Sequence, residues 1–143
     1  MKRASQSLAI DASPQVCFDA ITDYESFPGW QKAVKAVEVL TRDGDGRGHE
    51  VEFEIDAKVK TVRYTLAYSY EEPRRITWDY LGGDVKDVDG EFTFEDQGGL
   101  TLATYALAID PGVWLPGKIR SMLSEQVMKG SVEDLKRRVE GGG

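Results

Sequence analysis

The alternation of apolar and polar residues along most of the chain predicts a sheet of seven strands. It is clearest at 50–57, where four apolar residues alternate with four carboxylates. A period of two residues is typical of a strand with one dry face and one solvated face. Short turns separate the runs, so the strands are expected to pair as antiparallel hairpins. The runs that predict strands are 33–42, 48–57, 59–71, 75–81, 87–95 and 100–110, together with an amino-terminal strand.

Two short helices are expected between the first and second strands. Ser13-Pro14 marks the start of the first, because the Ser hydroxyl can cap the first turn and Pro has no N–H to lose there. Apolar residues then repeat on one helical face to about residue 22. The aromatic repeat that follows is interrupted by Pro28-Gly29, so the second helix is expected to be brief and to end at Trp30.

The carboxyl-terminal part of the chain changes to the period of a helix, from Pro116-Gly117 to Val139. About 22 residues give a helix of roughly 33 Å, long enough to cross the concave side of a seven-stranded sheet. Gly130 and Ser131 remove side-chain bulk in mid-helix, which favours a close approach to the sheet and alternatively leaves free volume beneath the helix. Residues 1–140 are expected to form one domain, and the tail 141–143 is expected to be disordered.

Several segments together resemble a known superfamily. They are the Ser-Pro helix start at 13–14, Tyr-x-x-Phe-Pro-x-Trp at 24–30, and the runs at 34–40, 64–68, 90–95 and 115–117. The chain resembles the START-like, helix-grip superfamily often labelled SRPBCC, and within it the polyketide cyclase/dehydrase and lipid-transport group, which includes coenzyme Q-binding proteins. The resemblance implies an α+β helix-grip fold, with a curved antiparallel sheet wrapped around the long carboxyl-terminal helix. Members range from enzymes to carriers, so it implies no single activity.

One face of the predicted sheet is unusually aromatic. Such residues can fill the space under the helix as an ordinary core. They can also form an amphipathic ligand site, because their rings give apolar surface and their hydroxyls fix orientation. The resemblance favours a cavity for the set as a whole. The residues expected to line it are Trp30, Phe53, Tyr64, Tyr68, Trp78, Tyr80, Phe92, Tyr105, Met122 and Gln126.

A gate to this cavity is expected where Trp residues lie between Pro and Gly, at 28–30 and 111–116. Phe27, Trp30 and Trp114 are the candidate gate residues. The alternative is that Trp114 simply caps the long helix.

Composition narrows the possible partners. Eighteen basic and 25 acidic residues leave a formal charge of −7, which argues against a general nucleic-acid or anionic-membrane binder. No segment reaches the ~20 apolar residues that span a bilayer, and no signal peptide is evident, so no integral membrane association is expected. Cys17 is the single cysteine, so no internal disulfide is possible and a cytoplasmic location fits.

Catalytic and metal-binding motifs are not evident in the sequence. His49 is the single histidine and has no nearby Cys, so neither a metal nor another cofactor is expected. The carboxylates of 50–57 belong to the solvated face. Aromatase/cyclase members are thought to use an inward Arg, but Arg63, Arg74 and Arg75 are expected to lie outside the cavity.

Three functions remain open. The first is a protein that binds, or binds and transports, a hydrophobic or aromatic small molecule such as a lipid, a quinone or a polyketide. The second is a polyketide aromatase/cyclase or dehydrase that positions its substrate and uses Tyr64, Tyr68 and Tyr80 as acid–base groups. The third is a protein-interaction domain or homodimer. Its expected surface is the outward row Leu102, Thr104, Ala106 and Ala108.

Overall fold

The computed structural model describes residues 3–56, 61–110, 112 and 117–141, with the side chains of the last helix described from Glu125 onward. Seven strands form one antiparallel sheet in the order β1-β7-β6-β5-β4-β3-β2. The elements, in chain order, are β1 (Ala4–Ile10), α1 (Pro14–Ile21), η1 (Tyr24–Gly29), β2 (Val34–Val39), β3 (Glu50–Asp56), β4 (Thr61–Glu71), β5 (Arg75–Gly83), β6 (Asp87–Asp96), β7 (Thr101–Asp110) and α2 (Gly117–Glu140).

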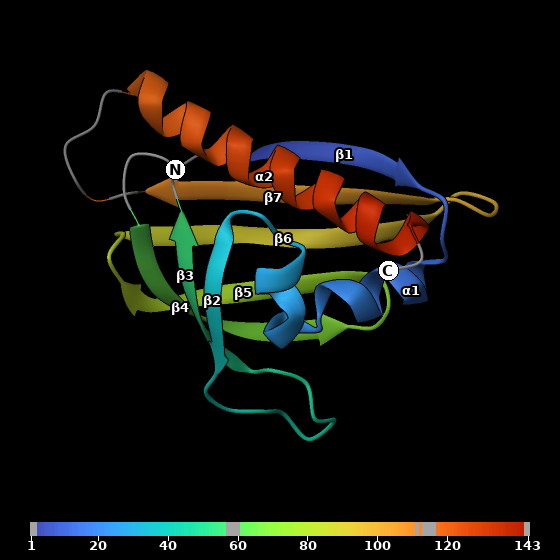
Figure 1. The fold of residues 1–143 in the computed structure, drawn as a ribbon, viewed down its shortest axis with the longest axis horizontal. Helices are drawn as coiled ribbons and strands as arrows, with labels where there is room; N and C mark the ends of the chain where they lie inside the picture. The colour runs from blue at the N-terminus through green and yellow to red at the C-terminus, as the bar shows by residue number, and fades with distance from the viewer. Residues whose placement is uncertain (1–2, 57–60, 111, 113–116, 142–143) are drawn as a thin grey trace.

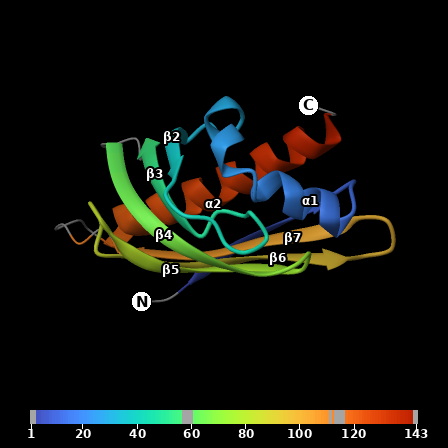
Figure 2. The same cartoon turned by 90° about the horizontal axis from the view of Figure 1, so that it is seen from below.

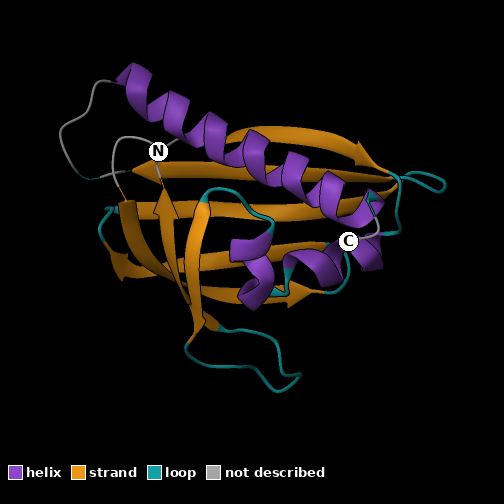
Figure 3. Ribbon diagram, viewed as in Figure 1, coloured by secondary structure: helices purple, strands orange, loops and turns teal. Residues whose placement is uncertain are grey.

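The sheet is strongly curved, and all three helical segments lie on its concave side (Figure 1). Viewed along the sheet, β2, β3 and β4 curl up toward the side on which α2 lies (Figure 2). The secondary structure divides the molecule into an outer layer of strands and an inner layer of helices (Figure 3). The predicted α+β helix-grip fold, with two short helices between the first two strands, is confirmed.

The short helices begin and end where the sequence predicts. The Ser13 hydroxyl accepts the Val16 N–H at 3.2 Å, and Pro14 is the first helical residue. The inner face of α1 buries Cys17 and Phe18 completely. The 3-10 helix η1 follows and ends where the Trp30 N–H donates to the Phe27 carbonyl at 3.0 Å.

Side chains alternate between the two faces of the sheet as expected. In β3, Val51, Phe53 and Ile55 are buried while the glutamates between them are partly exposed. On the convex face of β7, the Thr104 hydroxyl lies 2.8 Å from the Ser7 hydroxyl of β1. This face carries the outward row of β7, in which Ala108 is buried and the other three residues are partly exposed. Its role as a partner surface stays a prediction.

Gly90 lies at a position of the sheet that only glycine fits. Gly90 of β6 pairs with Trp78 of β5, and the indole lies across it. A Cβ at this position would lie 2.7 Å from the indole and 2.4 Å from the Ala106 carbonyl oxygen. Contacts this short are essentially never seen at a real Cβ, so Gly90 makes room for the Trp78 ring against the backbone of β6.

The last helix also covers the edge of the sheet that β1 forms. Met128, Val132 and Leu135 are buried beneath it. The Lys136 ammonium donates to the Ala9 carbonyl at 2.9 Å, and the Glu140 carboxylate accepts the Asp11 N–H at 2.7 Å. Covering an edge strand in this way removes a template for unwanted strand pairing.

The helix closes at Gly141, whose N–H donates to the Arg137 carbonyl at 2.9 Å. Residues 142 and 143 lie outside the described residues. The expected disorder of the tail 141–143 therefore stays a prediction.

Candidate functional site

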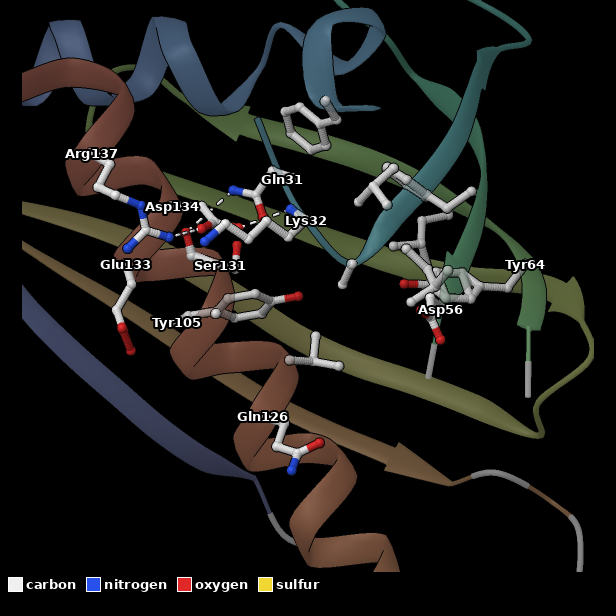
Figure 4. A pocket seen from close by; sticks show the side chains of 18 of the residues that line it. Gln31, Lys32, Asp56, Tyr64, Tyr105, Gln126, Ser131, Glu133, Asp134 and Arg137 are labelled. Carbon is white, nitrogen blue, oxygen red and sulfur yellow. Dashed lines mark hydrogen bonds and ion pairs between the residues drawn. The ribbon is translucent and has the colours of Figure 1, made fainter. Parts of the chain in front are cut away.

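A pocket of about 350 Å³ lies between α2 and the curled half of the sheet (Figure 4). On the sheet side, Phe53 and Ile55 of β3 and Leu66 of β4 give it an apolar wall. Val127 and Gly130 of α2 face them. The curvature of the sheet produces this space, because β3 and β4 rise beside the helix instead of lying flat beneath it.

Part of the residue set expected from sequence lies in this lining. Figure 4 shows Tyr64 and Tyr105 extending into the pocket from opposite sides, and Gln126 near the exposed part of α2. Their contact with a ligand stays a prediction. The expected residues that line the pocket are Phe53, Tyr64, Tyr68, Tyr105, Gln126 and the gate candidate Phe27.

Three other expected residues lie behind the lining. Trp78 and Phe92 are buried, with their rings against that of Tyr105 at centroid distances of 5.8 and 4.7 Å. Tyr80 is partly buried and its hydroxyl donates to the Val85 carbonyl. These residues share the inward parity of the pocket tyrosines but pack beside and beneath them.

The expected gate is described only in part. Trp30 lies beside the pocket, with its ring edge against Phe27 at 5.3 Å and its indole N–H donating to the Ser26 hydroxyl at 2.8 Å. Trp114 and the side chain of Met122 lie outside the described residues. A gating role for Phe27, Trp30 and Trp114 therefore stays a prediction.

The six tyrosines of the chain fall into two groups of three. Those outside the lining use their hydroxyls within the protein: Tyr24 and Tyr70 lie 2.8 Å apart, Tyr70 donates to the Gly48 carbonyl, and Tyr80 donates to Val85. Among the described interactions, the hydroxyls of the pocket tyrosines have no hydrogen-bond partner. Since polar groups inside proteins are normally paired, these three hydroxyls are available to a guest in the pocket. They belong to Tyr64, Tyr68 and Tyr105.

Burial raises the pKa of all three pocket tyrosines well above the ordinary value. Neighbouring hydroxyls add to the effect: Tyr64 raises the pKa of Tyr105, and both raise that of Tyr68. All three side chains line the same pocket. At neutral pH they are uncharged, so they donate hydrogen bonds and do not act as bases.

One further donor lies next to this group. The indole N–H of Trp78 is buried and is the one such side-chain atom without a partner in the described part of the chain. Trp78 is only 8% exposed, and its ring contacts that of Tyr68 at a centroid distance of 5.7 Å. An indole N–H donates only, so it can be satisfied only by an acceptor.

The mouth of the pocket is held by contacts between the η1–β2 connection and α2. The buried carboxylate of Asp134 accepts the Lys32 main-chain N–H at 2.9 Å and pairs with the Arg137 guanidinium. The buried Gln31 amide donates to the Ser131 carbonyl at 3.2 Å. We call these contacts of Gln31 and Asp134 the clasp, because they join segments about 100 residues apart at the rim.

The clasp residues are not among those expected from sequence. Asp134 has at most a weak signal, since it follows Val127 and Ser131 at the spacing of one helical face and lies between the apolar residues Val132 and Leu135 in sequence. Gln31 and Arg137 have none that separates them from ordinary surface residues. The Arg137 side chain is largely exposed and lies at the rim of the pocket.

Gly130 keeps part of the pocket open. A Cβ built on this residue would meet no atom within 4 Å, although the residue lies in the middle of α2 and lines the pocket. At Gly130 the helix therefore makes no close contact with the sheet, and the free volume expected beneath Gly130 and Ser131 stays a prediction.

Two other observations concern metals and membranes. The described residues hold no group of three or more His, Cys, Asp or Glu side chains arranged to bind a metal ion. None of the helices in the described part of the chain combines the length and the apolar character needed to cross a membrane.

Comparison with known proteins gives a family and a fold. The sequence profile of the family described as polyketide cyclase / dehydrase and lipid transport matches residues 1–140. No curated protein sequence matches the chain at a significant level.

Solved structures match over nearly the whole length. A START superfamily protein of Mycobacterium smegmatis superposes with a TM-score of 0.91 at 21% identity, covering all of both chains. The Zhui aromatase/cyclase of a Streptomyces species gives 0.78 at 18% identity, covering 99% of this chain and 98% of the other. A protein of Thermus thermophilus gives 0.82 at 20% identity, covering 99% of both. The resemblance to the START-like helix-grip superfamily is confirmed.

Proposed function

Because this chain belongs to the polyketide cyclase / dehydrase and lipid transport family, we propose that it binds a hydrophobic or aromatic small molecule, such as a lipid, quinone or polyketide, in the pocket under α2. One observation carries the proposal. Three tyrosine hydroxyls without partners in the described structure line a pocket that has aromatic and aliphatic walls and a charged rim, while the three tyrosines outside it are paired within the protein.

The pocket combines the two properties that small-molecule sites need. Its aromatic and aliphatic walls favour removal of apolar ligand surface from water, and its few polar groups can fix the orientation of the ligand. Its volume of about 350 Å³ lies near the lower end of the range of about 300–1,000 Å³ for such sites. This size favours a small aromatic molecule, or one end of a longer molecule.

A polyketide aromatase/cyclase or dehydrase is the second candidate. The observation that favours it is the protonated state of Tyr64, Tyr68 and Tyr105, because a positioned O–H can stabilise charge that develops on a carbonyl oxygen. Removal of a proton from a substrate would require another group, because the raised pKa makes these tyrosines poor bases. Binding requires no such group, and it is therefore our first proposal.

Filling the pocket tests the proposal directly. Gly130→Leu places a side chain in the open space of the pocket. Half-saturation of an apolar fluorescent probe should then require at least about ten times more protein, which corresponds to about 1.4 kcal/mol of lost affinity. Lys129→Leu is the matched control, because it adds the same side chain on an exposed residue outside the lining. Equal probe affinity in both variants would contradict the proposal.

Native mass spectrometry of the protein purified from its own host is the complementary test. A co-purifying small molecule that is present in the wild type and absent from Gly130→Leu would place the ligand in this pocket.

A further inference from the structure

We infer that the pocket selects an uncharged ligand that presents hydrogen-bond acceptor oxygens to its inner wall, and that it discriminates against organic anions such as fatty acids. This inference rests on the proposed function, because it names the chemical class that the same pocket takes. It follows from two independent features, the donors of the inner wall and the charges of the rim.

The inner wall is rich in donors. The hydroxyls of Tyr64, Tyr68 and Tyr105 line the pocket and have no partner among the described residues. Each carries a proton that it can donate. A ligand that brings acceptor oxygens therefore satisfies these donors, and a hydrocarbon of the same shape does not.

Among the described residues, the inner wall of Phe53, Tyr64, Tyr68 and Tyr105 carries no cation that could pair with an anion. The Arg137 guanidinium at the rim already pairs with Asp134, whose side chain is 4% exposed. If a ligand carboxylate took Arg137 away, the buried Asp134 carboxylate would lose its cation, and an unpaired buried charge is strongly unfavourable. Binding of an anion would thus exchange one ion pair for another and gain little.

The described rim offers an anion no excess of positive charge. Of the described side chains that line the pocket, five are charged: the carboxylates Asp56, Glu133 and Asp134, and the cations Lys32 and Arg137. The chain as a whole carries a formal charge of −7. An anionic head group therefore gains little electrostatic attraction at the described rim.

An uncharged oxygen has neither disadvantage. A ketone or ether oxygen loses little hydration on burial compared with a carboxylate, and it accepts from one or two of the phenol donors. Because Tyr64, Tyr68 and Tyr105 remain protonated far above neutral pH, this preference should not change across the physiological range.

The test uses three probes that share one skeleton: 2-acetylnaphthalene, its hydrocarbon analogue 2-isopropenylnaphthalene, and 2-naphthoate. Affinities are measured by calorimetric titration at neutral pH and moderate salt. We expect the ketone to bind about tenfold more tightly than the hydrocarbon, which corresponds to one satisfied hydrogen bond, and naphthoate to bind at least about tenfold more weakly than the ketone.

Phenylalanine variants assign the preference to the wall. Tyr105→Phe and Tyr68→Phe should reduce the preference for ketone over hydrocarbon, while the affinity for the hydrocarbon stays the same. Tyr70→Phe is the matched control, since its hydroxyl is used by Gly48 and Tyr24 away from the lining, and it should keep the preference.

The possible failures are distinct. Equal binding of ketone and hydrocarbon by the wild type, or tightest binding of naphthoate, would overturn the inference and leave the proposed function standing. An unchanged ketone preference in both pocket variants would also overturn it. If none of the three probes binds, the proposed function fails, and this inference fails with it.

Discussion

The main-chain N–H of Lys32 donates to the carboxylate of Asp134 at 2.9 Å, and this bond ties the connection before β2 to the last helix. Asp134 also pairs with Arg137 and is almost completely buried. A single carboxylate thus holds two segments that form opposite sides of the pocket mouth.

Asp134→Ala should lower the free energy of unfolding by about 1–3 kcal/mol, because the Lys32 N–H loses its acceptor in a buried setting. Asp134→Asn keeps an acceptor oxygen and loses only the pair with the half-exposed Arg137, so it should cost less than about 1 kcal/mol. Urea denaturation of both variants measures the difference. Equal destabilisation would show that the carboxylate charge, and not the bond to Lys32, is what matters.

Loosening the clasp should also change the rate of ligand entry. Gln31→Ala removes the bond to the Ser131 carbonyl without altering any aromatic residue of the pocket. We expect stopped-flow binding of an apolar fluorescent probe to become several-fold faster, because the mouth opens more often. If the association rate stays at the wild-type value, entry takes place elsewhere, for example near residues 111–116.

Alkaline pH should destabilise the domain through its tyrosines. Below about pH 10, the ordinary pKa of tyrosine, both folded and unfolded chains hold these protons and the contribution is constant. Above it the unfolded chain releases them while the fold retains them, so stability falls by about 1.4 kcal/mol per pH unit for each such tyrosine. For Tyr70, whose pKa is raised by burial to about 12, this loss ends near that value.

The measurement is urea denaturation at a series of pH values from about 9 to about 11. Tyr68→Phe removes one of the tyrosines with a raised pKa and should give a shallower decline than the wild type. Parallel curves would mean that Tyr68 ionises alike in the folded and unfolded chains.

Gly130→Ala should raise the free energy of unfolding by about 0.5–1 kcal/mol. The residue lies in the interior of α2, where alanine is the better helix former, and the added methyl group meets no atom within 4 Å. Thermal denaturation measures the change. A loss of stability would indicate that the helix at this point lies closer to the sheet than the structure shows.

Gly90→Ala should have the opposite effect. The added Cβ would lie 2.4 Å from the Ala106 carbonyl oxygen and 2.7 Å from the Trp78 ring, and overpacking of this kind costs about 1–3 kcal/mol. The tryptophan fluorescence spectrum should shift as the Trp78 indole moves. Wild-type stability combined with an unchanged spectrum would contradict the close packing described for this pair.

Local sequence signals predict most of the fold. Three local signals agree with the structure: the helix start at Ser13-Pro14, the end of the second helix at Trp30 and the alternation in β3. Each depends on interactions between neighbouring residues, so it does not depend on the rest of the fold. Glycines cause the clearest difference at a boundary. Gly82 and Gly83 suggest a turn after residue 81, but both belong to β5. Their φ values are 146° and 144°, and the register between β5 and β4 shifts next to them. A bulge and a turn demand the same backbone freedom, so composition alone does not separate them.

The sequence predicts the residues of the site less well than it predicts the fold. Parity along the strands places Tyr105, Trp78 and Phe92 on one face, but only the curvature of the sheet and the path of α2 decide which of them reach open space. The residues of the rim are even harder to predict from the sequence. Gln31 and Asp134 come together from distant parts of the chain, and in its own segment each resembles an ordinary polar residue.

The pairing of β1 with β7 and the clasp at α2 affect how the protein can fold during its synthesis on the ribosome. Ala4 can pair only after Leu107 has been synthesised, and the Lys32 N–H can donate to Asp134 only after that residue has been synthesised. Until then, the concave side of the sheet lacks the cover of α2. The pocket therefore closes only after Asp134 has been synthesised, and a small molecule that binds in it would stabilise the folded chain by mass action.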